Sequence, residues 1–324
     1  MAFYNDRVKL ADIDGREIYL IRKIKNKLKL NYYSYDGNNF EGDVADDALG
    51  EFDITINNGH VYLIYQDINR DIKLVILKGR EREVHSLTRG SFPRVYELNI
   101  INHKDRINLL FLYPIDDSHM TFRIEHNLLL GNKWKNFFVD EIKIEKLLNP
   151  IKLVPYENKL YLGYYYKNQI CIKSFNLEED LWSESIVLTD NRDKLYLDLI
   201  YDEGLFHLAY SEYKEGNYVI KYKRFNGQNF IKEDEVEMSR KSNASTPTFI
   251  RKADKLWLCW NESFIIYSRY SKDFGRTWSH LQTWEEGRRQ SIVRYKYATN
   301  NLKDMVLDHA FGTIYPDLKF IGFY

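Results

Sequence analysis

The stretch Glu157-Asn158-Lys159-Leu160-Tyr161-Leu162-Gly163-Tyr164 contains the pattern that decides the fold. A polar turn is followed by a short apolar segment that ends on an aromatic residue, and this arrangement recurs along the chain. The segment ends at positions that lie 43 to 51 residues apart: Arg22, Tyr65, Tyr113, Tyr164, Tyr210, Trp260 and Asp308. Because a β-prone run also precedes each turn, every copy predicts a hairpin. The chain is therefore a series of internal repeats.

A second turn lies further along most repeats and has the form Gly-x-x-aromatic, with Glu179 in place of the glycine in one copy. Its aromatic residues are Phe40, Trp134, Trp182, Phe230 and Trp278, of which the last four lie 48 residues apart. Each repeat thus has room for four strands, two around each turn. Four-stranded antiparallel sheets at this period are the blades of a β-propeller. We predict an all-β, seven-bladed propeller that forms a single domain over residues 1–324.

The last repeat is too short for a complete blade. Its second turn would place an aromatic residue at 326, beyond the end of the 324-residue chain. Residues near Phe3 and Tyr4 precede the first expected strand, 7–13, and are free to supply the missing outer strand, which would close the ring without an exposed edge. Six blades are the alternative, if either the first or the last copy of the pattern is spurious.

The composition agrees with an all-β chain and excludes several classes of protein. The 26 Tyr, 18 Phe and 6 Trp favour strands. The 47 Lys and Arg balance 47 Asp and Glu, so no bulk positive charge favours nucleic acid or an anionic membrane. No run of 18 apolar residues occurs, and we expect no membrane insertion. The N-terminus lacks the apolar core of a signal peptide. We therefore expect a cytoplasmic protein, or part of a particle or coat assembled without Sec export.

Metal and cofactor motifs are absent from the sequence. Cys171 and Cys259 are the only two cysteines and cannot form a disulfide framework. The sequence contains no Gly-rich phosphate loop, His-Glu-x-x-His or Cys-x-x-Cys. We expect neither a metal nor a cofactor.

One turn has a more specific sequence motif than the others, Ser271-Lys-Asp273-Phe-Gly275-Arg-Thr277-Trp278. The Ser and Asp side chains can bind backbone amides of the turn, Gly275 permits a positive φ, and Trp278 can pack back on the sheet. This sequence matches Ser-x-Asp-x-Gly-x-Thr-Trp at every defined position and resembles the Asp-box, or BNR repeat, of the sialidase superfamily. The resemblance implies a propeller in which this turn has a structural role, remote from any catalytic centre.

The resemblance also bears on catalysis. A sialidase of this superfamily would carry three arginines for the substrate carboxylate, a Tyr nucleophile paired with a Glu, and an Asp acid/base. Its early Phe-Arg-Ile-Pro motif is missing, and Phe92-Pro93-Arg94-Val95 has related letters in another order. We therefore expect a non-catalytic module. A glycoside hydrolase or lyase acting at the propeller axis, sialidase-like if catalytic, is the alternative.

The repeated ends of the apolar segments are the candidate binding residues. In a propeller they would share one rim, where aromatic faces beside polar groups suit a glycan or a protein surface. The candidate rim consists of Arg22, Tyr65, Tyr113, Tyr164, Tyr210, Glu212, Trp260, Glu262 and Asp308. Arg94, Arg289 and Arg294 are candidates for a basic channel at the axis. The competing interpretation is that the aromatic residues pack between sheets, and a structural role in a larger assembly is a second alternative. The oligomeric state stays open.

Overall fold

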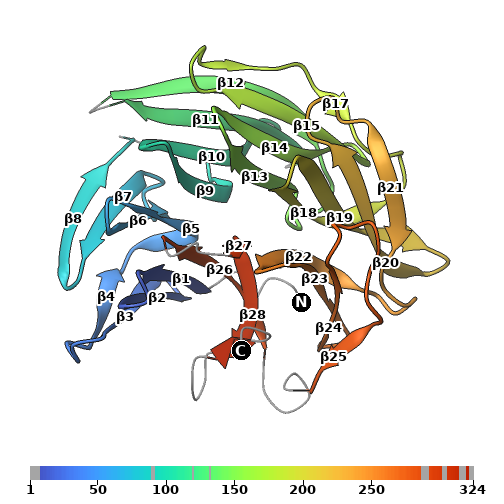
Figure 1. The fold of residues 1–324 in the computed structure, drawn as a ribbon. Coiled ribbons are helices and arrows are strands. Elements are labelled where there is room, and N and C mark those ends of the chain that lie inside the picture. The colour runs from blue at the N-terminus through green and yellow to red at the C-terminus, as the bar shows by residue number, and fades with distance from the viewer. Residues whose placement is uncertain are drawn as a thin grey trace. The chain divides into compact units, whose positions relative to one another are not determined.

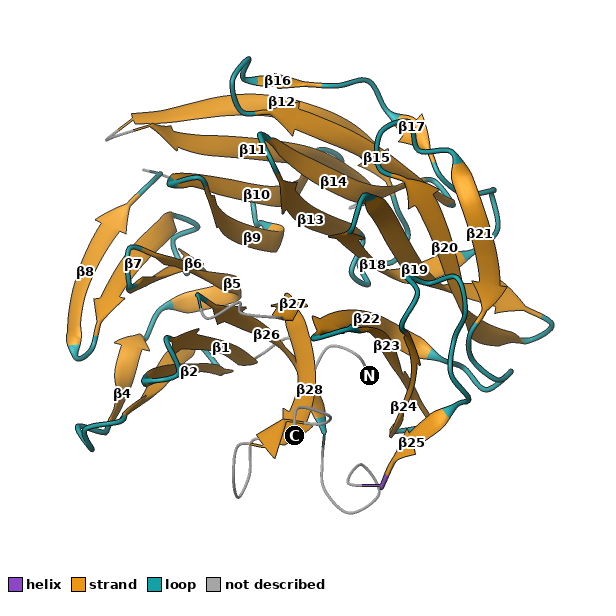
Figure 2. Cartoon of the chain, viewed as in Figure 1, coloured by secondary structure: helices purple, strands orange, loops and turns teal. Residues whose placement is uncertain are grey.

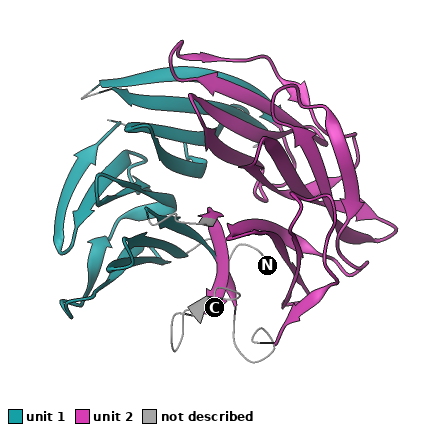
Figure 3. Ribbon diagram, viewed as in Figure 1, with its two compact units in different colours: residues 1, 3–142, 294–303 teal, residues 2, 143–293, 304–324 magenta. Residues whose placement is uncertain are grey.

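The computed structural model describes residues 8–88, 92–118, 120–130, 133–285, 292–300, 305–313 and 319–320. These residues form β-strands joined by turns and loops (Figure 2). Apart from a 3-10 position at Glu285, the described ranges contain no helix. No helix in them is long and apolar enough to cross a membrane. The strands form consecutive antiparallel sheets of four, the blades of the β-propeller fold class (Figure 1). By their contacts, residues 3–142 and 294–303 make one compact unit, and residues 143–293 and 304–324 make another (Figure 3).

Unit 1 contains the first three blades, each a meander in which neighbouring strands are consecutive in sequence. The first blade consists of β1 (Val8–Ile13), β2 (Glu17–Ile24), β3 (Lys27–Ser34) and β4 (Phe40–Ala45). The second consists of β5 (Ala48–Asn57), β6 (His60–Asp67), β7 (Ile72–Lys78) and β8 (Glu81–Ser86). The third consists of β9 (Tyr96–His103), β10 (Arg106–Pro114), β11 (Thr121–Leu130) and β12 (Lys133–Lys143).

Unit 2 contains the next three blades. The first has β13 (Ile151–Tyr156), β14 (Lys159–Tyr166) and β15 (Gln169–Asn176), with an outer edge shared by β16 (Leu181–Trp182) and β17 (Ile186–Val187). The second has β18 (Lys194–Asp202), β19 (Leu205–Lys214), β20 (Asn217–Asn226) and β21 (Lys232–Glu237). The third has β22 (Ser245–Lys252), β23 (Lys255–Glu262), β24 (Ile265–Ser271) and β25 (Gln282–Trp284).

The apolar segments that define the repeat are the second strands of the blades, β2, β6, β10, β14, β19 and β23. Their central residues are apolar without alternation, because both faces of a blade's sheet are buried there. In unit 1, Ile21 of β2 and Leu63 of β6 belong to one core. In unit 2, Ile220 of β20 and Trp260 of β23 belong to another. The four-stranded repeat predicted from the sequence is confirmed.

The prediction of seven blades is wrong, and the six-bladed alternative is correct. The segment Met305–Asp308, expected as the second strand of a seventh blade, provides β27 (Met305–Leu307), which pairs antiparallel with β22. Ahead of it, β26 (Val293–Thr299) pairs in parallel with β1. β1 and β22 each offer an inner edge whose backbone groups need partners, and β26 and β27 supply them. The predicted closing strand near Phe3 and Tyr4 lies outside the described residues.

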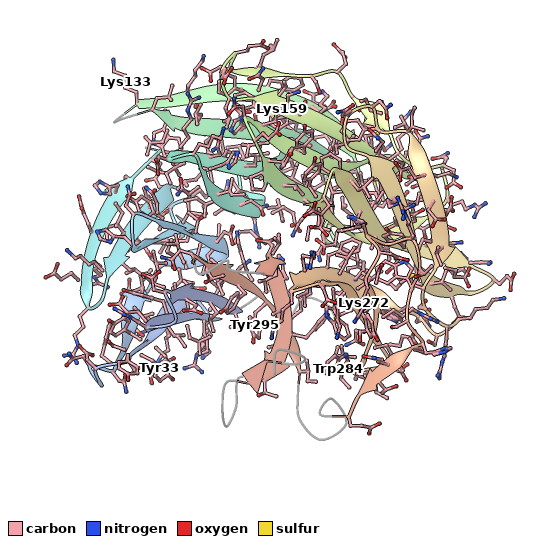
Figure 4. The ribbon with its side chains drawn as sticks, in the orientation of Figure 1. Tyr33, Lys133, Lys159, Lys272, Trp284 and Tyr295 are labelled. Carbon is pink, nitrogen blue, oxygen red and sulfur yellow. The ribbon has the colours of Figure 1, made fainter. Side chains whose placement is uncertain are left out.

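The chain continues from β27 into β28 (His309–Thr313) and β29 (Lys319–Phe320), which pair antiparallel. Tyr295 on β26, labelled in Figure 4, is fully buried. Of the C-terminal strands, β26 extends the inner edge of unit 1 by pairing with β1, and β27 extends the inner edge of unit 2 by pairing with β22. The prediction of one domain over the whole chain stays a prediction.

The innermost strands of unit 1 carry a buried ion pair. Asp53 on β5 accepts a hydrogen bond from the amide of Ile100 on β9 at 2.9 Å. Lys9 on β1 places its Nζ 3.4 Å from Oδ1 of the same carboxylate. Lys296 on β26 places its Nζ 2.5 Å from Oδ2. One buried carboxylate therefore joins three inner strands and the C-terminal strand β26.

Unit 2 repeats this arrangement. Asp198 on β18 accepts a hydrogen bond from the amide of Phe249 on β22 at 2.8 Å. Lys152 on β13 places its Nζ 3.1 Å from Oδ1 of Asp198. Here the C-terminal segment supplies an acid, since Oδ2 of Asp308 lies 2.5 Å from the Lys152 Nζ. Each unit therefore contains the same arrangement of a lysine, an aspartate and a backbone amide on its inner strands.

Candidate functional site

Most aromatic residues of the predicted rim are buried. Tyr164, Tyr210 and Trp260 are fully buried, and Tyr65 is nearly so. Tyr210 packs with its ring 5.8 Å below the ammonium of Lys194. None of these four rings faces solvent in the structure, so a binding role for them stays a prediction.

The polar atoms of three rim residues also have partners inside the protein. The Tyr164 hydroxyl donates to Ser185 Oγ at 2.9 Å, and the Tyr65 hydroxyl donates to Asp47 Oδ1 at 3.1 Å. The Trp260 Nε1 donates to Oε1 of Glu262 at 2.7 Å. Such contacts are typical of aromatic residues that hold loops to the sheet.

The remaining rim residues of the series also have partners. Arg22 is half-buried and donates from Nη2 to Asn31 Oδ1 at 2.7 Å. Tyr113 is half-buried and makes an edge-to-face contact with Phe92, the ring centroids being 5.6 Å apart. Asp308 is held by Lys152 in the inner-strand network.

The two rim glutamates are buried and fasten the segments that connect one blade to the next. Glu212 accepts from Nη1 of Arg192 at 3.0 Å. Glu262 accepts from Ser242 Oγ at 2.5 Å and from the Arg240 amide at 3.3 Å. Each carboxylate thus binds the connecting segment beside its own strand.

The candidate axis arginines have different surroundings. Arg94 is exposed, and its guanidinium carbon lies 5.4 Å from the centroid of the Tyr96 ring. Arg294 on β26 is buried. Arg289 lies outside the described residues. A basic channel made by these arginines stays a prediction.

The Ser271–Trp278 turn is held by its own side chains. The Gly275 amide donates to Ser271 Oγ at 2.8 Å, and the Thr277 amide donates to Asp273 Oδ1 at 2.8 Å. The Thr277 hydroxyl donates to the other oxygen of Asp273 at 2.6 Å. Burial disfavours the charged carboxylate, but these hydrogen bonds outweigh it and lower the pKa of Asp273 to about 2.

The same turn fits tightly against the neighbouring blade of unit 2. Trp278 lies edge-to-face on Tyr222, with ring centroids 4.9 Å apart. Gly275 has φ +77°, and a Cβ at this position would lie 1.9 Å from the Tyr222 hydroxyl. The contacts of the turn are therefore those of a folding element.

A different group of residues is accessible, and it lies on what we call the connection face of unit 2. This face is formed by the blade-connecting segments 188–193 and 238–244 and by the turns 167–168, 215–216 and 263–264 between second and third strands. They lie at one end of the sheets because the start of each first strand pairs with the end of its second strand, as Lys194 does with Glu212. The Ser271–Trp278 turn follows the opposite end of β24.

The centre of this face is a group we call the tyrosine cluster: Tyr213, Tyr218, Asp193 and Arg192. Tyr213 at the end of β19 is 49% exposed, and its ring is edge-to-face with Tyr218, the centroids being 5.4 Å apart. The Tyr218 hydroxyl donates to Asp193 Oδ2 at 2.7 Å. Burial and this carboxylate raise the pKa of Tyr218.

Backbone contacts fix the cluster in place. The Tyr213 amide donates to the Asp193 carbonyl at 2.9 Å, and the Tyr218 amide donates to Asn243 Oδ1 at 3.2 Å. Beneath the cluster, the buried hydroxyl of Tyr165 has no hydrogen-bond partner among the described residues. Burial and the nearby Asp193 raise the pKa of Tyr165, which keeps its hydroxyl a donor. The half-exposed Tyr213 ring therefore lies against Tyr218, whose hydroxyl binds the Asp193 carboxylate.

The charges around the cluster neutralise one another. Arg192 pairs with Glu212 at 3.0 Å and with Asp190 at 3.3 Å. Lys194, which is buried, pairs with Asp190 at 2.8 Å. Burial lowers the pKa of Lys194, while Asp190 opposes this effect. The surface thus offers hydrogen-bonding groups without a strong net charge.

Sequence reasoning did not identify the tyrosine cluster, because it followed the repeated position and Tyr213 lies three residues beyond it. The available signal was the pair Tyr213 and Tyr218 on the two sides of a Glu215-Gly216 turn. Two aromatic residues that flank a tight hairpin turn are cross-strand neighbours, here paired in register. Among the described residues, no three His, Cys, Asp or Glu side chains are grouped as metal ligands.

Comparisons with known proteins show the fold and leave the family open. No protein-family model and no curated protein sequence matches the chain. Among solved structures, the polysaccharide lyase Uly1 matches with a TM-score of 0.54 at 10% identity, over 86% of this chain and 81% of that chain. The α-L-arabinofuranosidase Arb93A from Fusarium graminearum matches with a TM-score of 0.52 at 10% identity, over 81% and 92%.

A mutant of the Aleuria aurantia lectin in complex with α-methyl-L-fucoside matches with a TM-score of 0.49 at 9% identity, over 85% of this chain and 94% of that chain. At such low identity, the lyase and the arabinofuranosidase are likenesses of fold alone. The resemblance to the sialidase superfamily stays a prediction.

Proposed function

We propose that the protein is a non-catalytic binding module of the β-propeller class that recognises a neutral glycan through the tyrosine cluster. The observation that carries the proposal is the half-exposed Tyr213 ring, which contacts Tyr218 and whose backbone amide binds Asp193, the residue whose carboxylate holds the Tyr218 hydroxyl. A sugar ring has an apolar C–H face, which stacks on an aromatic ring, and hydroxyl groups at its edge, which donate to a carboxylate. The cluster offers both kinds of contact on neighbouring residues.

The electrostatics of the cluster support a neutral ligand. Arg192 is already paired with Glu212 and Asp190, so it is poorly placed to hold a sugar carboxylate by itself. The contacts of Tyr218 and Asn243 hold the surface before any ligand arrives, which lowers the entropic cost of binding. By their names, the arabinofuranosidase and the polysaccharide lyase that share the fold act on carbohydrates. That likeness agrees with the proposal without carrying it.

A glycan array followed by calorimetry tests this function. We expect saturable binding of at least one neutral glycan, and Tyr213→Ala should weaken it about ten-fold, which corresponds to about 1.4 kcal/mol of lost stacking. Tyr213→Phe should retain most of the affinity because it keeps the ring. Asp193→Asn should weaken binding because a carboxylate accepts stronger hydrogen bonds than an amide.

The matched control is Ile68→Ala, which removes a side chain of similar exposure, 54%, from the corresponding kind of turn in unit 1. This variant should bind like the unchanged protein. Absence of binding to every glycan on the array would contradict the proposal. Cleavage of a bound glycan would instead support the hydrolase or lyase alternative.

A further inference from the structure

A strained aromatic residue lies at another point on the connection face of unit 2. Ser263 and Phe264 form the two-residue turn between β23 and β24, with φ of +50° and +69°. Bulky side chains avoid this left-handed region. The corresponding turn of the preceding blade, Glu215-Gly216, has glycine where Phe264 stands, with φ +88°. Phe264 is therefore a poor choice for the turn itself.

The side chain of Phe264 also contributes little to the stability of the fold. Its side chain is 74% exposed, so it adds little to a hydrophobic core. Its backbone is nevertheless fixed, since its amide donates to Asn261 Oδ1 at 3.0 Å. Below it, Glu262 is buried and held by Trp260 and Ser242. An apolar ring is thus presented to solvent on a rigid support, which is a typical arrangement at functional sites.

The segment 238–244 joins this turn to the tyrosine cluster. Near the cluster, Lys241 pairs with Glu215, and Asn243 accepts from the Tyr218 amide at 3.2 Å. Near Phe264, Ser242 donates to Glu262 at 2.5 Å. Alternate residues of one polar segment therefore contact the two neighbouring turns. Aromatic rings lie on both sides of a strip of hydrogen-bonding groups.

We propose that the ligand is an oligosaccharide, with Phe264 as an extension subsite for a sugar unit beyond the one that stacks on Tyr213. This inference rests on the proposed glycan-binding function and adds the length of the ligand. One sugar stacks at Tyr213 beside Asp193. The chain then crosses the 238–244 segment, whose polar groups meet its hydroxyls, and a further unit packs against the Phe264 ring. The strained backbone at Phe264 is explained because the ring acts in binding.

Calorimetric titration with a ladder of neutral oligosaccharides tests this inference. The probes are gluco-, manno- and galacto-oligosaccharides from monosaccharide to hexasaccharide. The unchanged protein should bind the longer members of one series about ten-fold more tightly than the monosaccharide. Phe264→Gly should abolish that gain and leave the monosaccharide affinity unchanged. Tyr213→Ala should weaken binding of every length.

Phe264→Gly should also raise the thermal midpoint by about 2 °C, because glycine adopts the left-handed region without strain. Phe274→Gly is the matched control. Phe274 is also exposed, at 40%, also has a positive φ, +57°, and follows the opposite end of β24. Its replacement should leave the affinity for every sugar unchanged.

The outcomes separate this inference from the proposed function. If no glycan of the array and no sugar of the ladder binds the unchanged protein, the proposed function fails and the inference fails with it. If short and long sugars bind equally, or if Phe264→Gly keeps the gain with length, only the inference is overturned. Capture of a protein partner through Phe264 with no effect of sugar length would overturn it as well.

Discussion

The turns between second and third strands expose aliphatic side chains in unit 1 and aromatic ones in unit 2. The exposed residues are Ile24, Ile68 and Ile115 in unit 1 and Tyr166, Tyr213 and Phe264 in unit 2. Isolated exposed aliphatic residues are common on protein surfaces. Three exposed rings on successive blades are less common, and they lie beside polar connecting segments. This difference between the turns supports the proposed contact surface on unit 2.

The difference does not come from different frameworks. Both units join a lysine on their first inner strand to an aspartate on their second, Lys9 with Asp53 and Lys152 with Asp198. Both aspartates also accept a hydrogen bond from an amide of the third inner strand. Because the inner strands of the two units are alike, they do not require the aromatic residues in the turns of unit 2.

Replacing the inner aspartates should have the largest effect and tests whether the frameworks are equivalent. Asp53→Asn and Asp198→Asn both keep an acceptor for the amide but remove a buried charge. Asp53→Asn removes the carboxylate that faces Lys9 and Lys296. After Asp198→Asn, Lys152 keeps Asp308 as an ion-pair partner at 2.5 Å. Loss of one partner from a buried pair costs about 3 to 5 kcal/mol. In the free energy of unfolding, measured by denaturant titration, we expect a loss of this size from Asp53→Asn and a smaller but clear loss from Asp198→Asn, because Asp308 stays beside Lys152.

The control for this pair is Asp43→Asn, which breaks the surface contact between Lys27 and Asp43 at 2.6 Å. An exposed ion pair contributes little, so this variant should unfold almost like the unchanged protein. A large loss for one inner aspartate and a negligible loss for the other would show that the two frameworks differ.

Glycines in equivalent turns of the two units should differ in their tolerance of a methyl group. Gly37 and Gly275 both have positive φ, +82° and +77°. A Cβ at Gly37 meets nothing within 4 Å, whereas one at Gly275 would lie 1.9 Å from the Tyr222 hydroxyl. Gly37→Ala should cost about 1 kcal/mol of backbone strain, and Gly275→Ala about 3 kcal/mol once the steric clash is added. Equal losses in thermal unfolding would contradict the packing seen at Tyr222.

The blades were predictable because burial leaves a local record. Each second strand has an apolar centre, and the turn before it carries Asn, Asp or Gly, so the period is visible in the sequence. The number of blades was not predictable, because the fate of the last repeat depends on distant pairing. Lys296 of β26 pairs with Lys9, and Leu307 of β27 with Ile250, contacts that no local pattern encodes.

The candidate site was predictable only in part, because the repeat pattern identifies buried residues rather than accessible ones. A residue repeated in every blade, such as Tyr210, is most often repeated because it packs, and Tyr210 is fully buried. The accessible residues depart from the repeat: Tyr213 lies three positions further on, and Phe264 stands where the preceding blade has Gly216. In a repeat protein, a residue that recurs in equivalent positions indicates packing. A residue that departs from the repeat and lowers stability is a better sign of function.

The smallest expected effect concerns Tyr166 and its counterpart Ile24, which are the last paired residues before equivalent two-residue turns. Tyr166 lies one blade from the tyrosine cluster, and Lys167 is 5.5 Å from its ring centroid. Tyr166→Ile gives unit 2 the residue of unit 1 and should weaken oligosaccharide binding about two- to three-fold, since it removes one peripheral ring. Ile24→Tyr should change nothing, because its turn lacks the neighbouring cluster. Binding gained by Ile24→Tyr would mean that an exposed ring alone is sufficient, and the assignment of the contact surface to unit 2 would fail.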